Sequence, residues 1–586
     1  MNKKIIKYLF VLLGLLILSL KLYLATNGYQ HIIYGYDTPR TMSTITETIS
    51  NETIEHFSSP QSALFIYFTS AVKLIAGISA VDMLFVPLLL ITFLGFFLIY
   101  ILAKEMFRDK NIAIFASILY AVSTLIQLAT SSNLLFFITL PLFFIILLKY
   151  LKKEVNLLPL ILSSEALYLS YPSIPYVVFS IVSMFFFFKL INAINENSNS
   201  SVISRYADFF IILPIVFISS YYVSKYLTII EYADIVSYLN RTLGIWRGDL
   251  PKYFYIIMFI ISVFLSLIAF LSQFYVEKLK FLVTYLIDWQ NSIIKFFRKF
   301  PSKLNYLFIF IFILGVLDLI MIFFIKNTES EFYSLNKFLL KDFIGGELWR
   351  IIFFSISIFL ISLPAIFFFF YKKRKLLDQH LIPILLFIIL IFTGAIPFMR
   401  ELLGPFYGDR GYRSIMLYAI ILFSAFIVML AKNKSLHKYL TIFITIVFST
   451  SLIASFVGIK NLYDKKPNIE FIKDMKFLEK TLDSNSIFYL TRGQFKSDIS
   501  APTKFYSFSF IHSDIPFESM VRVNEENLIM NDFDEFVKIL NKSKTKYIIT
   551  EPNFELEKTK KIEKITTKLY SNDKGVSVYF LNNINL

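Results

Sequence analysis

Residues 83–103 read MLFVPLLLITFLGFFLIYILA, an apolar run without a single charged side chain. Its length matches the roughly 20 residues that a helix needs to cross the hydrocarbon core of a bilayer. Comparable runs lie near 5–24, 111–129, 134–150, 157–171, 174–190, 208–224, 253–273, 305–325, 350–371, 381–397, 414–431 and 439–458. The sequence therefore predicts an α-helical polytopic membrane protein with about 13 transmembrane helices.

The composition excludes several other classes of protein. Of the 586 residues, 56% are hydrophobic and 17% are charged, and the mean hydropathy is +0.64, which neither a soluble fold nor a disordered chain would have. Cysteine is absent, so disulfides, cysteine-based metal sites and cysteine nucleophiles are excluded. No Gly-Lys pair occurs, which excludes a phosphate-binding P-loop and an ATPase built on it.

The charges of the connecting segments predict the orientation of the chain. Basic residues occupy every second gap between the runs, which marks those gaps as cytoplasmic and places the N-terminus inside. In the first loop, 25–82, the segment 37–55 carries Asp37, Glu47, Glu52 and Glu55 against Arg40 alone, which is typical of an outer segment. The net charge of +16 is then a topology signal, and we expect a multi-pass cell-membrane protein that binds no nucleic acid.

The chain divides by composition into two parts. Residues 1–458 hold the apolar runs, whereas 459–586 are polar and rich in Lys, Asn, Asp and Glu. Because an odd number of spans returns the chain to the outer face, we expect 459–586 to form an extracytoplasmic α/β domain. Its expected helices are 469–482 and 533–540, and its expected strands are 486–490, 547–550 and 576–581.

The first outer loop has the signals of two helices lying on the outer surface. Thr38 suits the N-cap and Pro39 the first position of one helix, and Ser59-Pro60 repeats this signature before the apolar stretch 63–75, which Gly77 can end. Asp37 then lies beside a helix N-terminus, where its carboxylate favours the ionised form and can accept a proton from a nucleophile. The alternative is that Asp37 only caps a turn.

These residues resemble the N-terminal half of the GT-C glycosyltransferase superfamily, which includes protein mannosyltransferases and aminoarabinose lipid A transferases. The resemblance rests on the order of four features: a first span, the Gly35-Tyr36-Asp37-Thr38-Pro39 stretch, the segment 59–79 and a second span ending at 100–107. It covers roughly the first 190 residues. The tryptophan-rich signature of oligosaccharyltransferases is absent, because no tryptophan follows Trp349. A typical oligosaccharyltransferase is therefore not expected.

The resemblance implies an inverting transfer of a sugar from a polyprenyl-phosphate-linked donor to a glycan, lipid or protein acceptor on the outer face. It places Asp37 as the catalytic base or acceptor orienter, with Arg40 nearby. No cofactor is expected and no metal ligands are assigned, because 129–133 lacks the second acidic motif; a divalent metal stays open.

Further candidates come from polar residues within or beside the spans. Arg410 and Arg413, flanked by glycines before a late span, can bind the lipid phosphate with two donors each, or can be interfacial arginines. Glu165 lies inside a span, where an ionisable group costs about 2.5–3.5 kcal/mol, and can line the sugar cavity with Tyr36 and Tyr171 or form a buried structural hydrogen bond.

Two alternative functions are also compatible with the sequence. A multi-pass transporter or lipid flippase would use Glu165 and Asp318, but it needs broken helices or repeated halves that the sequence does not display. A non-catalytic envelope assembly protein would present 459–586 at the surface, with no convergence of Asp37 on the arginines.

Overall fold

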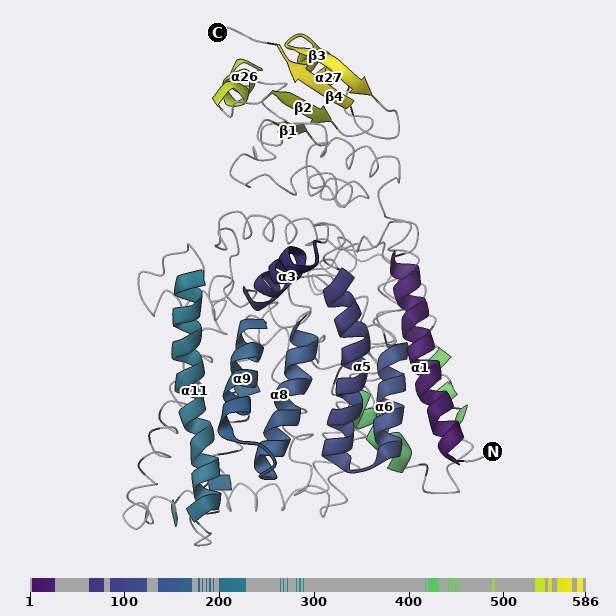
Figure 1. The fold of residues 1–586 in the computed structure, drawn as a ribbon, viewed down its shortest axis with the longest axis vertical. Coiled ribbons are helices and arrows are strands. Elements are labelled where there is room, and N and C mark those ends of the chain that lie inside the picture. The colour runs from purple at the N-terminus through teal and green to yellow at the C-terminus, as the bar shows by residue number, and fades with distance from the viewer. Residues whose placement is uncertain are drawn as a thin grey trace, which may run out of the picture.

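The computed structural model describes the residues 3–26, 63–77, 85–123, 135–170, 200–227, 487–490, 533–542, 546–550, 556–571 and 577–582, with scattered positions in 178–193, 264–288 and 417–452. These residues form a bundle of long helices and a separate four-stranded sheet (Figure 1).

Among the described residues, the bundle contains the long helices α1 (Lys3–Thr26), α5 (Phe85–Phe107), α6 (Lys110–Val122), α8 (Phe136–Leu151), α9 (Leu157–Ser170) and α11 (Ser200–Leu227). α5 packs on α6 and α8, α1 packs on α6, and α9 packs between α8 and α11. Phenylalanine fills the interior of this bundle; Phe186 and Phe209, for example, stack with their rings 4.4 Å apart. Short connections join α5 to α6 and α8 to α9, so each of these two pairs is antiparallel.

Each of these helices coincides with an apolar run of the sequence. The bounds differ by a few residues, except that α6 ends at Val122, well before the end of the run 111–129, and α11 begins eight residues before the run 208–224. In the part of the chain that the structure describes, no helix combines the length and apolarity of a membrane span. The run 414–431 is described over most of its length and is helical at 420–429, whereas the other predicted runs lie wholly or mostly outside the described residues, so the number of spans stays a prediction.

The close contact of α5 with α6 depends on a glycine. A Cβ atom at Gly95 would collide with the hydroxyl of Tyr120, whose side chain is fully buried between the two helices. A larger residue at position 95 would force the buried ring of Tyr120 to shift within a close-packed interior, so glycine permits this close approach.

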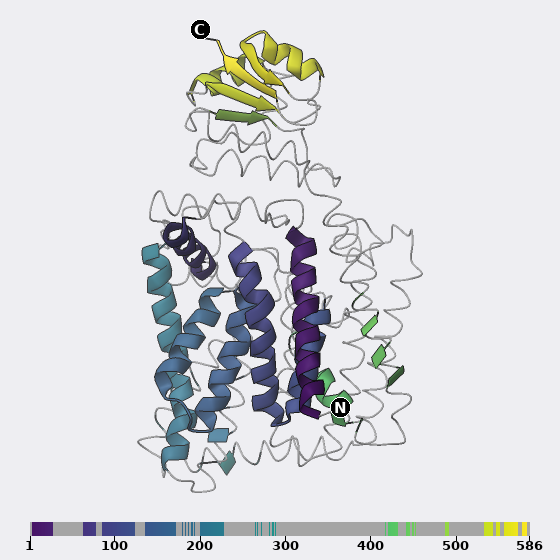
Figure 2. The ribbon, with the colours of Figure 1, turned by 45° about the vertical axis from the view of Figure 1, so that its right-hand side comes forward.

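The helix α3 (Ala63–Ala76) runs across the ends of the long helices instead of along them (Figures 1 and 2). Its sequence is apolar except for Lys73 and small polar residues, and it ends at Gly77, whose φ of 62° is the left-handed conformation that favours glycine at a helix C-terminus. The predicted second helix of the first loop is therefore present, and Gly77 ends it as expected. The first predicted helix lies outside the described residues.

The C-terminal part forms a sheet with the strand order β1-β2-β4-β3, made of β1 (Ile487–Leu490), β2 (Tyr547–Thr550), β3 (Thr566–Ser571) and β4 (Ser577–Leu581). β1 pairs parallel with β2, and the other pairs are antiparallel. The helices α26 (Phe533–Lys542) and α27 (Leu556–Glu563) accompany the sheet. In both views this sheet lies beyond the end of the bundle where α3 lies.

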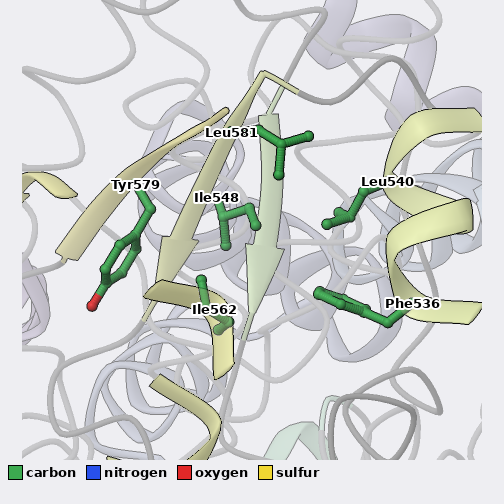
Figure 3. Close-up of a cluster of buried hydrophobic side chains, with 6 residues drawn as sticks. All are labelled: Phe536, Leu540, Ile548, Ile562, Tyr579 and Leu581. Atoms are coloured by element: carbon green, nitrogen blue, oxygen red, sulfur yellow. The ribbon is translucent and has the colours of Figure 1, made fainter. Parts of the chain in front are cut away.

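Side chains from both helices and two strands form the hydrophobic core of this sheet (Figure 3). The cluster consists of Phe536, Leu540, Ile548, Ile562, Tyr579 and Leu581. Burial in this core raises the pKa of the Tyr579 hydroxyl above its usual range, and the negative charge of Glu563 raises it further. The expected strands 486–490, 547–550 and 576–581 match β1, β2 and β4, whereas the sequence analysis missed α27 and β3. The domain boundary between 458 and 459 stays a prediction.

Candidate functional site

The candidate site is the end of the bundle that α3 crosses, which we call the α3 end. α1, α6, α9 and α11 finish there and α8 begins there, as their directions in Figure 1 show. α3 contacts α9 directly. Buried polar side chains at this end come from α1, α3, the C-cap of α6, α8 and α9: Lys21, Ser70, Ser123, Thr139 and Ser170.

The inner face of α3 carries two neighbouring hydroxyl groups in different situations. Phe65, Thr69 and Ser70 are buried, and Thr69 Oγ1 donates a hydrogen bond of 2.8 Å to the carbonyl oxygen of Phe65. Ser70 is 5% exposed, and its Oγ has no hydrogen-bond partner; it is the one such buried side-chain oxygen or nitrogen among the described residues. A buried hydroxyl without a partner destabilises the state in which it is left unpaired.

Lys21 holds the ends of α1 and α6 together. The side chain is fully buried, and Nζ donates to the carbonyl oxygens of Ala121 at 2.6 Å and Ser123 at 2.8 Å. The last carbonyls of a helix lack partners within the helix and carry partial negative charge, which a cation stabilises. Lys21 therefore fixes the point from which the first loop, beginning after α1, leaves the bundle.

Two hydrogen bonds join α9 to its neighbours below α3. The hydroxyls of Thr139 on α8 and Ser170 on α9 lie 2.7 Å apart. Glu165, five residues before Ser170, accepts a hydrogen bond of 2.6 Å from Ser219 Oγ on α11. The Glu165 carboxylate is partly buried and thus contacts a second helix of the bundle. This contact is compatible with both roles considered for Glu165, so its place in a sugar cavity stays a prediction.

The other predicted site residues lie outside the described residues: Tyr36, Asp37, Arg40, Tyr171, Arg410 and Arg413. Their convergence on one site is therefore untested, and their roles stay predictions. In the described part of the chain, no group of three or more His, Asp or Glu side chains is arranged to hold a metal ion.

The sequence analysis missed two residues of this end. Lys21 could have been noticed, because it interrupts the apolar run 5–24 and a charge within such a run is usually functional or paired. Nothing in the sequence distinguishes Ser70 from Thr69, since the difference arises only from the presence or absence of a partner in the fold.

The opposite end of the bundle is held by different contacts. Lys152, after α8, forms an ion pair with the carboxylate of Glu105 at the end of α5. The side chain of Asp109 accepts from the backbone N–H of Asn111 and caps the N-terminus of α6. The side chains of Lys152 and Glu105 are partly exposed, so this end serves as a comparison for the buried contacts of the α3 end.

No protein-family model matches this chain, and no curated protein matches it either. Solved structures do match. The archaeal oligosaccharyltransferase AglB from Archaeoglobus fulgidus, in complex with an inhibitory peptide and a dolichol-phosphate, is similar with a TM-score of 0.52 at 13% identity, over 99% of this chain and 75% of that chain. The same organism's oligosaccharyltransferase tethered with an acceptor peptide containing the NVT sequon gives a TM-score of 0.53 at 13% identity, over 98% and 74%.

ArnT from Cupriavidus metallidurans bound to undecaprenyl phosphate also matches, over 99% of this chain and 98% of that chain at 11% identity, but its TM-score of 0.39 carries no argument. The neighbours are membrane glycosyltransferases of the GT-C superfamily. This chain is similar in fold to the AglB structures, and this is the fold that the resemblance in the first loop implied. At this level of identity the similarity concerns the fold alone.

Proposed function

We propose that this protein is a membrane glycosyltransferase that takes a sugar from a polyprenyl-phosphate donor and transfers it to an acceptor at the α3 end. The observation that carries the proposal is the similarity in fold to the AglB structures over nearly the whole chain. One of those structures holds a dolichol-phosphate and an inhibitory peptide, which suggests the same classes of donor and acceptor site here.

The arrangement of the described elements supports this proposal. α3, which belongs to the first loop, crosses the bundle at the end that also faces the C-terminal sheet. Lys21, five residues before the end of α1, anchors this helix to the end of α6, and the segment that carries Asp37 follows α1 in the chain. An acidic residue that follows a rigid anchor can be held in a constant orientation toward a reacting group.

The proposed reaction needs one base and a site for the leaving phosphate. The nucleophilic oxygen or nitrogen of the acceptor attacks the anomeric carbon of the donor, and the bond from that carbon to the lipid phosphate breaks, with inversion of configuration. The Asp37 carboxylate takes the proton of the nucleophile. Arg40, Arg410 and Arg413 are the candidates for holding the released phosphate, because guanidinium groups bind it through two donors. The reaction is proposed to take place outside the cytoplasm.

The variant Asp37→Asn tests the base. It keeps the size and polarity of the side chain but cannot accept a proton at neutral pH. We expect it to reduce transfer by at least about 100-fold, because general base catalysis contributes 10²–10⁴-fold. The measurement is mass spectrometry of cell-envelope glycans in a strain lacking the gene and complemented with each variant.

Asp109→Asn is the matched control. It makes the same chemical change at the opposite end of the bundle, where asparagine also serves as an N-cap, so the glycans should be as in the wild type. Normal glycans in the Asp37→Asn strain would remove the base assignment. An unchanged glycan profile after deletion of the gene would remove the transferase function.

A further inference from the structure

The end of the bundle opposite α3 gathers basic side chains from two separate turns. The turn between α5 and α6 and the turn between α8 and α9 both lie at this end (Figure 1). Their segments 104–110 and 149–154 together hold six basic residues against three acidic ones. We call the six basic residues the basic patch: Lys104, Arg108, Lys110, Lys149, Lys152 and Lys153.

Contacts within the fold join the two turns and leave a surplus of positive charge. Lys152 pairs with the carboxylate of Glu105 from one turn to the other. The hydrogen bond from Lys152 holds the pKa of the Glu105 carboxyl below its usual range, against the opposing effect of burial. The positive charges of Lys149 and Lys104 lower this pKa further, so both ammonium groups lie within electrostatic reach of the pair. Three lysines thus surround one carboxylate, which cannot neutralise them all.

Two residues of the basic patch adopt a backbone conformation that favours glycine. Arg108, directly after α5, has a φ of 52°, and Lys153, just after α8, has a φ of 69°. The N–H of Arg108 donates to the carbonyl oxygen of Lys104 at 2.8 Å, and that of Lys153 donates to Tyr150 at 3.0 Å, so both residues end a helix where glycine is the usual choice.

The side chains at these two positions are exposed as well as basic. The left-handed conformation is unfavourable for residues with a Cβ atom, and such conformations are retained where the residue has a role. A cytoplasmic turn needs basic residues, but it does not need them at the position that ends the helix. The placement of Arg108 and Lys153 therefore indicates that their charges are used at this surface.

Apolar side chains are exposed directly beside the basic patch. Leu158 is 63% exposed and Leu162 is 61% exposed. They are four residues apart and so lie on one side of α9, which begins at Leu157, shortly after Lys153. A ligand that suits both surfaces has an anionic head for the basic patch and apolar chains for the leucines.

We propose that the basic patch binds the headgroup of an anionic phospholipid in the adjacent leaflet, with the acyl chains lying over Leu158 and Leu162. Each lysine or arginine near an anionic membrane surface contributes to such binding, and the guanidinium of Arg108 can offer two donors to the phosphate. The patch lies at the end opposite α3, away from the place of the proposed transfer reaction. The inference therefore does not depend on the proposed function.

The test measures lipid binding to the full-length protein in detergent by native mass spectrometry. Phosphatidylglycerol is the probe, and phosphatidylcholine, whose head has no net charge, is its counterpart. We expect phosphatidylglycerol to bind more tightly than phosphatidylcholine. The double variant Lys149→Gln/Lys153→Gln should bind phosphatidylglycerol about 10-fold more weakly, because two of the charges that attract the head are lost. Binding of phosphatidylcholine should change much less.

Lys560→Gln/Lys564→Gln is the matched control. It removes two exposed lysines from α27 and the residue that follows it, so it lowers the net charge of the protein by the same amount. Binding of phosphatidylglycerol should stay as in the wild type. An equal loss of affinity in both double variants would mean that net charge alone attracts the lipid, and it would overturn the inference.

Arg108→Gly separates lipid binding from folding. Glycine adopts a φ of 52° freely, so the melting temperature without lipid should not fall, whereas phosphatidylglycerol should bind several-fold more weakly. If the melting temperature falls and the affinity is unchanged, Arg108 only complements the C-terminal end of α5, and the inference is wrong. Equal affinity of the wild type for both lipids, or displacement of phosphatidylglycerol by equimolar glycerol phosphate, would also contradict it.

Discussion

The two ends of the helical bundle use lysine in the same way but at different depths. At the α3 end, Lys21 is fully buried and bonds the backbone carbonyls of Ala121 and Ser123. At the opposite end, the Lys152 side chain is 25% exposed and pairs with the carboxylate of Glu105, and it also reaches the Glu105 carbonyl at 3.5 Å. In both cases a cation lies at the C-terminal end of a helix, where it complements the helix dipole.

The comparison shows that burial, and not charge, decides how much such a contact contributes to the free energy of unfolding. Water can replace Lys152 at a partly exposed helix end, so the ion pair there adds little. The carbonyls that Lys21 binds are sealed inside the bundle, and without the lysine they lose their hydrogen bonds with no solvent to replace them. The α3 end should therefore depend strongly on its lysine, and the opposite end should not.

The largest expected effect is that of Lys21→Ala. This change removes two buried hydrogen bonds and leaves a cavity where the four-carbon stem was, so we expect a loss of about 3–5 kcal/mol in the free energy of unfolding. The measurement is thermal unfolding of the purified protein in detergent.

Lys21→Met separates the two contributions. Methionine retains most of the stem, so the loss should shrink to about 1–3 kcal/mol, the effect of the unpaired carbonyls alone. A Lys21→Met variant as stable as the wild type would mean that the free-energy cost of burying the ammonium equals the gain from its two hydrogen bonds. In that case the α3 end would not depend on its lysine more strongly than the opposite end does.

An intermediate effect is expected for Ser170→Ala, which removes the hydrogen bond between α8 and α9. Thr139 keeps a weaker bond of 3.4 Å to the carbonyl oxygen of Phe136, so the loss should be about 1 kcal/mol. Ser163→Ala is the control, because the Ser163 hydroxyl donates within α9, to the carbonyl oxygen of Leu160 at 3.1 Å.

A double-mutant cycle of Ser170→Ala with Thr139→Val isolates the contact between the helices. A coupling energy near zero would show that the two hydroxyls do not stabilise the α3 end together.

The sequence predicted the helices well because their signal is local. Apolar runs gave the positions of the bundle helices, and the apolar stretch 63–75 followed by Gly77 gave α3 almost to the residue. β2 was predicted in full, since it is a short β-branched and aromatic segment. α27 and β3 were missed because their sequences, LEKTKKIE and TTKLYS, are polar and lack a clear apolar period.

The polar contacts of the α3 end could not be predicted from the sequence, because they form only in the folded chain. Lys21 and its acceptors are 100 and 102 residues apart, so the pair exists only after α1 has packed on α6. The missing partner of Ser70 is likewise a property of the folded chain. The chemistry of Asp37 and the arginines, in contrast, rests on the sequence and the resemblance, and it stays a prediction until variants are measured.

The smallest expected effect is that of Lys152→Met at the opposite end. Exposed and partly exposed ion pairs contribute about 0–1 kcal/mol, and salt screens them, so the loss in the free energy of unfolding should be below about 1 kcal/mol and should fall further at high ionic strength. Lys153→Met, at an exposed position beside it, controls for the general loss of one positive charge. The measurement is the same thermal unfolding at low and high salt. A loss as large as that of Lys21→Ala, unaffected by salt, would mean that Lys152 is as deeply coupled to its helix end as Lys21, because only a contact shielded from solvent resists screening.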